Sequence, residues 1–408
     1  MRIAMVHSSF AIRGGAEQYV RDLSRALAAR GHQVRVFSSP SVNAEPADEP
    51  VRTRLSNRGG RLPRPLNKVL AHLGDLIDPT GLRVDDLRTF APDVVHVHNW
   101  QGLGAVPVAR LARAYPTCHT VHDYALCDPN NALANRGRSG LVDRALRVRS
   151  AWLVRRLRRV TLLWPAQRTR DIVRGQVPGE ARLTGRVVPL AVFTGVRRPV
   201  SWPPGDRRVF LFLGALSEHK GIDLLLDAWR EAGAGVGAGA GAGAEAGAGA
   251  GATLLIAGDG PRRVAVEAAA RTLPGVEYLG YLDGPGKEAA LRRAGWLVLP
   301  SQWAENYPIS CCEALLAGRP LLASRVARPP MASDGSVRTF GDRADLVDLL
   351  RHAATLPDAE YDAAAASAAH DGRQLDWERH VDAVLDSYRS VRSRPDLPGL
   401  LHHEVTTA

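Results

Sequence analysis

The residues best suited to chemistry lie in the stretch SQWAENYPISCCEALLAGRPLLAS, residues 301–324. Glu305 and Glu313 are eight positions apart, and Pro308 stands between them at the expected start of a helix. Proline favours such a start because its missing N–H is not needed there. The free N–H groups and the dipole of a helix start bind phosphate oxygens. A carboxylate about a turn and a half further on can accept two hydrogen bonds from a vicinal diol such as ribose, each worth about 1.5–3 kcal/mol.

Strands and helices must hold these groups at one edge of a sheet. Expected strands at 209–214, 253–258, 276–280, 296–300 and 320–324 alternate with helices from Ile222, near 264–271, near 287–294 and from Pro308. This alternation predicts a doubly wound parallel sheet covered on both faces. Ligands of such sheets bind beyond the carboxyl ends of the strands, where residues 301–308 are expected.

The first half of the chain repeats the same α/β pattern. A strand at 3–6 leads through Gly14–Gly15 into an amphipathic helix, and a strand at 34–37 follows. Further strands are expected at 93–98, 117–122, 160–164 and 186–190. The sequence thus predicts an N-terminal domain over 1–196, a proline-rich linker over 197–208, a C-terminal domain over 209–376 with a flexible Gly/Ala insertion over 232–252, a final helix over 377–392 and a disordered tail over 393–408.

The composition is that of an ordinary soluble globular protein. The 408 residues are 45% hydrophobic and 23% charged, and we find no apolar run of 18 residues. The N-terminus leads straight into a strand pattern without a cleavable signal, so we expect a cytoplasmic protein. None of its four cysteines forms a C-x-x-C pair, which favours reduced structural thiols: Cys118, Cys127, Cys311 and Cys312.

Positive charge is concentrated between Arg136 and Arg174. This window holds twelve arginines and two aspartates, and therefore carries +10 of the net +11. Its helical wheel has an apolar stripe of Val142, Leu146, Leu153, Leu157 and Val160, with Arg144, Arg147, Arg155 and Arg158 opposite. The arginines could bind an anionic membrane surface or an anionic acceptor, or form the solvated face of a helix packed on its own domain. Nucleic acid is not expected as a partner, because interleaved aromatics and a recognised binding module are lacking.

Taken in order, several motifs resemble those of the family 4 retaining glycosyltransferases, which have the GT-B fold. ENYPISCCE (305–313) with ALLAGRPLLAS looks like the paired-glutamate motif and the run that follows it in that family. GALSEHKG (214–221) resembles its phosphate-binding loop, and AGDGP (257–261) its G-x-G-P turn. VEYLGYL (276–282) resembles the edge of its base pocket, and TVHDY (120–124) its T-x-H-D segment.

The resemblance implies a fold and a set of roles. The fold would be α/β, with two Rossmann-like domains facing an interdomain cleft and a last helix crossing back to the N-terminal domain. Implied catalytic residues are His122, Glu305 and Lys220. Implied donor-binding residues are Gly15, Lys220, Glu305, Asn306, Tyr307, Glu313, Gly258 and Tyr281, and acceptor-binding candidates are Asn99, Trp100 and Asp123. For Asn99 and Trp100, simple packing is an equal alternative.

The implied reaction moves a sugar from a nucleotide-diphosphate donor to a hydroxyl of a lipid-linked precursor or a natural-product scaffold, with retention. We find no evident covalent nucleophile, so front-face substitution is expected, with positioning and charge stabilisation as the catalytic effects. No Asp-x-Asp is found, so neither metal nor cofactor is expected. A metal cluster of His96, His98, His119 and His122 is the weaker interpretation, because no carboxylate or cysteine completes it.

Two departures leave a second function open. Ala215 stands where the resembled loop has an arginine, so one cation for the phosphates is missing unless Arg262 supplies it. ARPPMASDG (327–335) replaces a glycine-rich turn. A catalytically weak or inactive nucleotide-sugar-binding protein is therefore the alternative. A docked position at the inner face of the membrane is compatible with either function.

Overall fold

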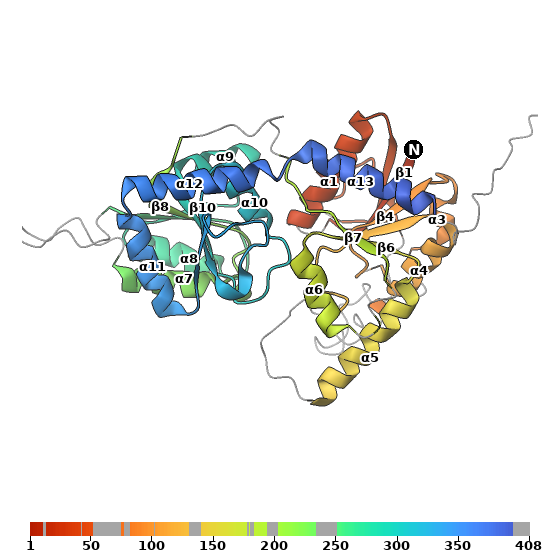
Figure 1. Ribbon diagram of the computed structural model, residues 1–408, viewed down its shortest axis with the longest axis horizontal. Helices are drawn as coiled ribbons and strands as arrows, with labels where there is room; N and C mark the ends of the chain where they lie inside the picture. Colours follow the sequence, from red (N-terminus) through yellow and green to blue (C-terminus); the bar gives the residue numbers. More distant parts are fainter. Residues whose placement is uncertain are drawn as a thin grey trace, which may run out of the picture. The chain divides into compact units, whose positions relative to one another are not determined.

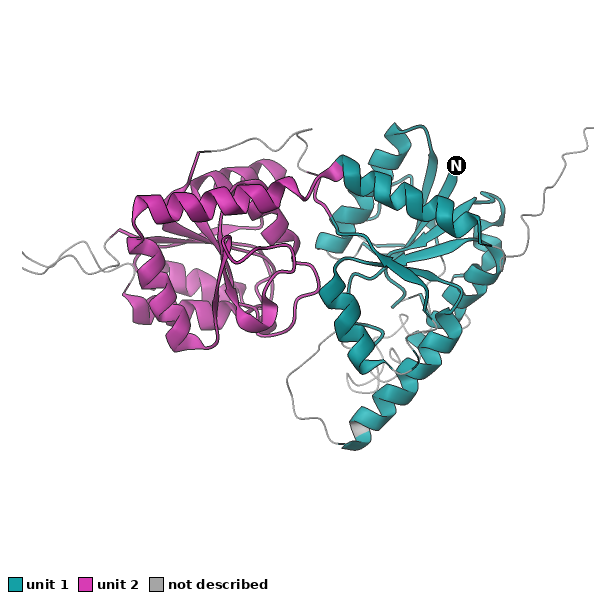
Figure 2. Cartoon of the chain, in the orientation of Figure 1, with its two compact units in different colours: residues 1–190, 378–408 teal, residues 191–377 magenta. Residues whose placement is uncertain are grey.

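The computed structural model describes residues 1–10, 14–41, 43–51, 75–76, 82–101, 103–129, 140–177, 179, 183–193, 203–233 and 251–394. The chain divides into two compact units (Figure 2). Unit 1 comprises residues 1–190 and 378–408, and unit 2 comprises residues 191–377. Half of the expected linker (197–202) and most of the Gly/Ala insertion and of the tail lie outside the described residues. The end of the expected linker, from Asp206, opens the first strand of unit 2.

Unit 1 is built on a seven-stranded sheet in the order β3-β2-β1-β4-β5-β6-β7, with every neighbouring pair parallel. Its strands are β1 (Arg2–Ser9), β2 (Gln33–Ser39), β3 (Glu49–Pro50), β4 (Val94–Val97), β5 (Thr117–Thr120), β6 (Thr161–Trp164) and β7 (Gly185–Val187). Its helices include α1 (Gly15–Ala29), α3 (Val84–Arg88), α4 (Ala105–Ala114), α5 (Gly140–Leu157) and α6 (Gln167–Gln176). β1 is fully buried from Ile3 to Val6, as a central parallel strand requires. The two-residue edge strand β3 was not predicted.

The last helix, α13 (Trp377–Arg392), packs on unit 1 although it follows unit 2 in sequence (Figures 1 and 2). The Tyr388 hydroxyl lies 2.7 Å from Nδ1 of His96 on β4, and His380 Nε2 lies 2.8 Å from the Tyr19 hydroxyl on α1. Arg30, which caps α1, adds ion pairs to Glu378 and Asp382. The predicted return of the final helix to the N-terminal unit is confirmed.

Unit 2 contains a six-stranded parallel sheet in the order β10-β9-β8-β11-β12-β13. The strands are β8 (Asp206–Leu213), β9 (Thr253–Ala257), β10 (Val276–Gly280), β11 (Ala294–Leu299), β12 (Leu321–Ser324) and β13 (Val337–Phe340). The helices are α7 (Ile222–Ala232), α8 (Arg263–Thr272), α9 (Gly284–Arg293), α10 (Ile309–Leu316), α11 (Arg343–Thr355) and α12 (Asp358–Arg373). In Figure 1, α7, α8 and α11 cover one face of the sheet and α9, α10 and α12 the other.

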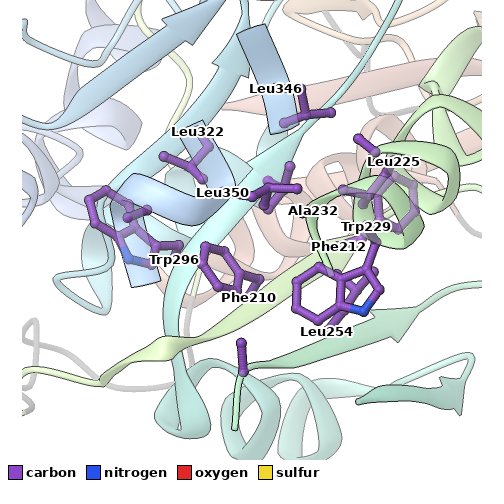
Figure 3. Close-up of a cluster of buried hydrophobic side chains, with 14 of the residues drawn as sticks. Phe210, Phe212, Leu225, Trp229, Ala232, Leu254, Trp296, Leu322, Leu346 and Leu350 are labelled. Carbon is purple, nitrogen blue, oxygen red and sulfur yellow. The ribbon is translucent and has the colours of Figure 1, made fainter. Parts of the chain in front are cut away.

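A large hydrophobic core packs on the central strands of unit 2 (Figure 3). Trp229 of α7 packs edge-on against Phe210 of β8 at 5.7 Å between ring centroids, and its Nε1 donates to the Pro274 carbonyl. Trp296 of β11 is fully buried in the same cluster. This packing holds β8 and β11 rigidly beneath the loops that leave their carboxyl ends.

No helix within the described ranges is both long enough and apolar enough to cross a membrane.

Candidate functional site

The candidate site of unit 2 begins where β8 and β11 lie side by side, because the chain leaves β8 toward one flank of the sheet and β11 toward the other. Such a switch point opens a crevice at the carboxyl ends of the strands. The two loops touch here: Gln302 N donates to the His219 carbonyl at 2.9 Å. Gly221 has φ +74°, and a Cβ at this position would lie 1.9 Å from the Pro300 carbonyl oxygen. Only glycine therefore lets the loop that carries Lys220 approach the loop that carries Glu305.

Lys220 and Glu305 meet across these loops. Lys220 Nζ lies 2.7 Å from Glu305 Oε1, and the same oxygen accepts hydrogen bonds from Ser301 Oγ at 2.6 Å and Trp303 Nε1 at 3.0 Å. The Glu305 side chain is 9% exposed and that of Lys220 26%. Burial alone would raise the pKa of Glu305, but the Lys220 charge and these three hydrogen bonds outweigh it and hold the pKa below its usual value. Glu305 is therefore an ionised, nearly buried acceptor beside a cation.

Glu313 lies on α10, in its second turn, with a side chain that is 12% exposed. The helix begins at Ile309, one position later than predicted, and Pro308 is its N-cap in extended conformation. The Glu313 carboxylate accepts a hydrogen bond from Lys287 Nζ, which comes from the first turn of α9. Lys287 was not predicted as a site residue, although its rarity was a signal, because it is one of three lysines in the chain.

The other predicted donor residues divide into two groups. Asn306 and Tyr307 are buried between Glu305 and α10, and burial raises the pKa of Tyr307 so that its hydroxyl stays protonated. Tyr281 is 53% exposed just after β10. Gly258 has a structural explanation of its own, because a Cβ there would lie 1.8 Å from the Gly214 carbonyl oxygen.

Arg262 lies beside the 214–221 loop, which is where a substitute for the missing loop arginine is needed. Its backbone N donates to the Leu216 carbonyl at 2.9 Å. Its guanidinium Nε lies 2.9 Å from Asp223 Oδ2, in the first turn of α7. A cation is therefore available next to this loop even though Ala215 carries none.

In unit 1, His122 follows β5 near the switch point between β1 and β4. Its Nε2 lies 3.3 Å from Nδ1 of His98, and the Tyr19 ring packs edge-on at 5.3 Å. Burial, followed by the neighbouring histidines, holds the pKa of His122 well below its usual value, so the ring is neutral near pH 7. Gly15 is the first residue of α1, and Gly14 N donates to Glu17 Oε2 at 3.1 Å.

Protein groups contact two other histidines of this cluster, His96 and His119, whereas Nε2 of His98 is buried and has no hydrogen-bond partner among the described residues. The two ring nitrogens of His96 lie 2.7 and 2.8 Å from the hydroxyl oxygens of Tyr388 and Thr120, and His119 Nδ1 lies 2.9 Å from the Val97 carbonyl oxygen. In the part of the chain that the structure describes, no three His, Cys, Asp or Glu side chains are grouped to hold a metal ion.

The acceptor candidates have local roles. Asn99 Oδ1 accepts from Gln101 N at 3.1 Å, and Asp123 Oδ1 from Ala125 N at 2.9 Å, so both stabilise turns. Burial raises the pKa of Asp123 to about 6. Trp100 is only 1% exposed, with Arg149 5.8 Å above its ring, which favours the packing alternative.

The four cysteines are all free thiols and all buried. Burial raises the pKa of Cys311 and of Cys312, so these thiols stay protonated and are poor nucleophiles.

Helix α5 explains part of the basic window. Leu153 and Leu157, together with Val160 just beyond the helix, are buried as the wheel predicts, while Arg144, Arg147 and Arg155 are exposed. Leu146 of the same stripe is half-buried, and the side chain of Val142 lies outside the described part of the structure. The structure also exposes two apolar side chains that the wheel did not single out, Leu141 (79%) and Val148 (66%).

Comparison with known proteins agrees with this architecture. Residues 13–183 match the family model described as Glycosyltransferase Family 4, and residues 207–355 match Glycosyl transferases group 1. A glycogen synthase of Mycobacterium tuberculosis is 28% identical, over 98% of this chain and 99% of its own. A phosphatidyl-myo-inositol mannosyltransferase of Mycobacterium leprae is 26% identical, over 96% and 97%.

Among solved structures, a sucrose-phosphate synthase from Thermosynechococcus elongatus superposes with a TM-score of 0.67 at 17% identity, covering 96% of this chain and 98% of that one. This likeness concerns the fold, which is the two-unit GT-B arrangement of parallel sheets. The two family matches together span most of the residues from which the sheets and the site are built. The chain therefore belongs to the family 4 glycosyltransferases of GT-B fold, enzymes that transfer a sugar from a nucleotide-sugar donor.

Proposed function

We propose that this protein is a retaining, metal-independent hexosyltransferase that moves a sugar from a nucleoside-diphosphate sugar to an acceptor hydroxyl. The observation that carries the proposal is the Lys220–Glu305 pair at the switch point of unit 2. Glu305 is an ionised acceptor for sugar hydroxyls, and Lys220 is a cation for the diphosphate. A nucleotide sugar carries sugar hydroxyls next to a diphosphate, which are the two groups that this pair would bind.

The remaining donor contacts follow from α10 and the loop before it. The N–H groups at the start of α10 would bind pyrophosphate oxygens together with Lys220. Glu313 would accept hydrogen bonds from the ribose diol, and Tyr281 would lie at the edge of the base. Asn306 and Tyr307, both buried, hold the loop between the two glutamates in place.

We propose front-face substitution for the chemical step. The bond between the anomeric carbon and the diphosphate oxygen breaks, and its electron pair leaves with the diphosphate. The acceptor oxygen attacks from the same face and its proton passes to the departing diphosphate, so no protein nucleophile is needed. Lys220 stabilises the negative charge that develops on the leaving group. Metal independence is proposed because Lys220 can supply this charge.

The acceptor is proposed to be a lipid-linked precursor presented at the inner face of a membrane. One similar protein is named a phosphatidyl-myo-inositol mannosyltransferase. Helix α5 exposes arginines together with Leu141 and Val148, a combination that suits an anionic bilayer surface. A soluble natural-product scaffold is the alternative acceptor, and binding to anionic vesicles separates the two.

The test measures release of nucleoside diphosphate from a panel of nucleotide sugars, with and without EDTA. We expect turnover by the wild type and a loss of at least a hundredfold in Glu305→Ala and Lys220→Ala. Arg230→Ala, which removes an exposed ion pair with Asp227 on α7, is the matched control and should retain activity. Wild-type rates in both site variants would refute the assignment. The anomeric configuration of the product, read by NMR, tests retention.

A second candidate function is donor binding without turnover, favoured by Ala215 in the phosphate loop. Calorimetric binding of a nucleotide sugar without release of diphosphate, in the presence of candidate acceptors, would support it.

A further inference from the structure

Lys287 has no place in the function proposed above, although it contacts a central residue of the site. Its Nζ donates to Glu313 Oε1, and this is the only hydrogen bond that the structure gives that carboxylate within its described residues. The side chain of Lys287 is 29% exposed and that of Glu313 12%. The pair therefore opens to solvent on the lysine side.

Helix stability does not account for a lysine at this position. α9 begins at Gly284 with Asp283 as its N-cap, whose Oδ1 accepts from Gly286 N at 3.1 Å. Lys287 lies in this first turn, where the helix dipole disfavours a positive charge. The other two cations of the helix, Arg292 and Arg293, lie in its last turn, where the dipole favours them.

The choice of lysine is also unusual for this chain. Lysine and arginine together number 53, and only three of them are lysines: Lys68, Lys220 and Lys287. Lys220 and Lys287 each pair with one of the two glutamates of the site. Lysine carries a compact charge with three rotatable donors, whereas arginine presents a rigid planar fork. A compact donor suits a position beside a carboxylate that must also bind a ligand.

A ribose hydroxyl needs both kinds of partner, because it donates one hydrogen bond and accepts others. Ionised Glu313 can only accept and Lys287 can only donate. We propose that Lys287 and Glu313 act together as a charge-paired clamp for the donor ribose, in which Glu313 accepts from a ribose hydroxyl while Lys287 donates to its oxygen. This inference rests on the donor site of the proposed function and makes Lys287 a specificity-determining residue within it.

The clamp also explains how the Glu313 carboxylate can lose its contact with water when an uncharged ribose diol binds to it. A carboxylate that is already largely buried would lose its remaining contact with water when the ribose binds, which is costly for an isolated charge. The ammonium of Lys287 stays beside it and compensates this loss. Without the lysine, the hydroxyls would have to solvate the carboxylate alone.

The experiment compares binding of ribonucleotides with that of their deoxy analogues. Dissociation constants of UDP, GDP and ADP identify the nucleotide that binds best, and its 2′-deoxy and 3′-deoxy forms are then measured. In the wild type, losing one hydroxyl between two charged partners should weaken binding about tenfold to a hundredfold. In Lys287→Met this ratio should fall about tenfold, whereas Lys287→Arg should retain part of it.

The controls separate specificity from folding. Arg292→Met removes a cation from the far end of the same helix and should leave the ratio unchanged. Glu313→Gln should lower the ratio as Lys287→Met does, and thermal melts check that both variants are folded.

The possible results distinguish failure of the clamp from failure of the donor site. If Lys287→Met keeps the wild-type ratio, or if the wild type binds a nucleoside diphosphate without preferring the ribose form, the clamp is refuted while the donor site remains. If the wild type binds none of the three nucleoside diphosphates, the donor site and the clamp are both refuted.

Discussion

Replacing Lys220 by Met tests the ion pair at the centre of the site. The substitution removes the positive charge and leaves Glu305, 9% exposed, with neutral donors from Ser301 and Trp303. Breaking a fully buried pair from one side costs about 3–5 kcal/mol. Lys220 is 26% exposed, so water screens part of this effect. We expect unit 2 to lose about 1–3 kcal/mol of its free energy of unfolding.

The double variant Lys220→Met/Glu305→Gln should recover at least half of this loss, because no unpaired charge stays buried. The assay is urea unfolding at pH 7 with hydrogen exchange measured on β11 and α10, which reports on unit 2 alone. Turnover should be lost in the single and the double variant alike. Stabilities of the two variants that agree within about 0.5 kcal/mol would contradict the reasoning, since neighbours in contact are expected to show at least that coupling.

The effect of Glu305 on stability should depend on pH with opposite signs in the wild type and in Lys220→Met. In the wild type the pKa of Glu305 lies below its unfolded value, so its contribution to stability is present at neutral pH and lost as pH falls through the folded pKa. In Lys220→Met the burial effect is left without the cation, and the pKa should lie above the unfolded value. Glu305 then favours the folded state more as pH falls. Equal slopes of stability against pH in the two proteins would refute this account.

Three further predictions concern other parts of the molecule. Arg262→Ala should weaken binding of a nucleoside diphosphate several-fold, measured by calorimetry, if this side chain supplies the charge that Ala215 lacks; unchanged affinity would contradict that role. Gly221→Ala should destabilise unit 2 by more than 2 kcal/mol in urea unfolding, because its φ of +74° costs an L residue about 1–2 kcal/mol and its Cβ would meet the Pro300 carbonyl; an unchanged midpoint would mean that the loops can separate freely. Unit 1 should lose stability between pH 6.5 and about 4, because burial lowers the pKa of His96 to about 3 and of His119 and His380 to about 4, while histidines of the unfolded chain protonate near 6.5. At pH 5 each of these histidines should lower the free energy of unfolding by about 2 kcal/mol. Hydrogen exchange on β4 and β5 at pH 7 and pH 5 measures this loss, and equal stability at the two pH values would contradict the prediction.

The sequence was sufficient for the sheets because buried parallel strands read as continuous apolar runs. VFLFLG and WLVLP predicted β8 and β11 to within a few residues, and the resemblance of the loops that follow to family motifs then pointed to Lys220 and Glu305. Short edge strands escaped prediction, since β3 has two residues and β13 is the alternating tetrapeptide VRTF. Such segments are defined by the neighbour they pair with and not by their own composition.

Contacts between distant residues escaped prediction for the same reason. Lys287 and Glu313 are 26 positions apart, and only the packing of α9 near α10 brings them together. The burial of Trp100 could not be read from its position after β4, because a strand end and a packed turn look alike in sequence. On α5 the wheel predicted the buried stripe, but it could not show that the first turns of the helix extend beyond the core and leave Leu141 exposed.

The discontinuity of unit 1 has a consequence for synthesis on the ribosome. Unit 2 is one uninterrupted segment, residues 191–377, and can fold as soon as it emerges. Unit 1 begins 190 residues earlier but lacks the Tyr388 and His380 contacts until α13 has been translated. The segment made first is therefore completed last, and a nascent chain that stops before residue 378 would release a complete unit 2 attached to an incomplete unit 1.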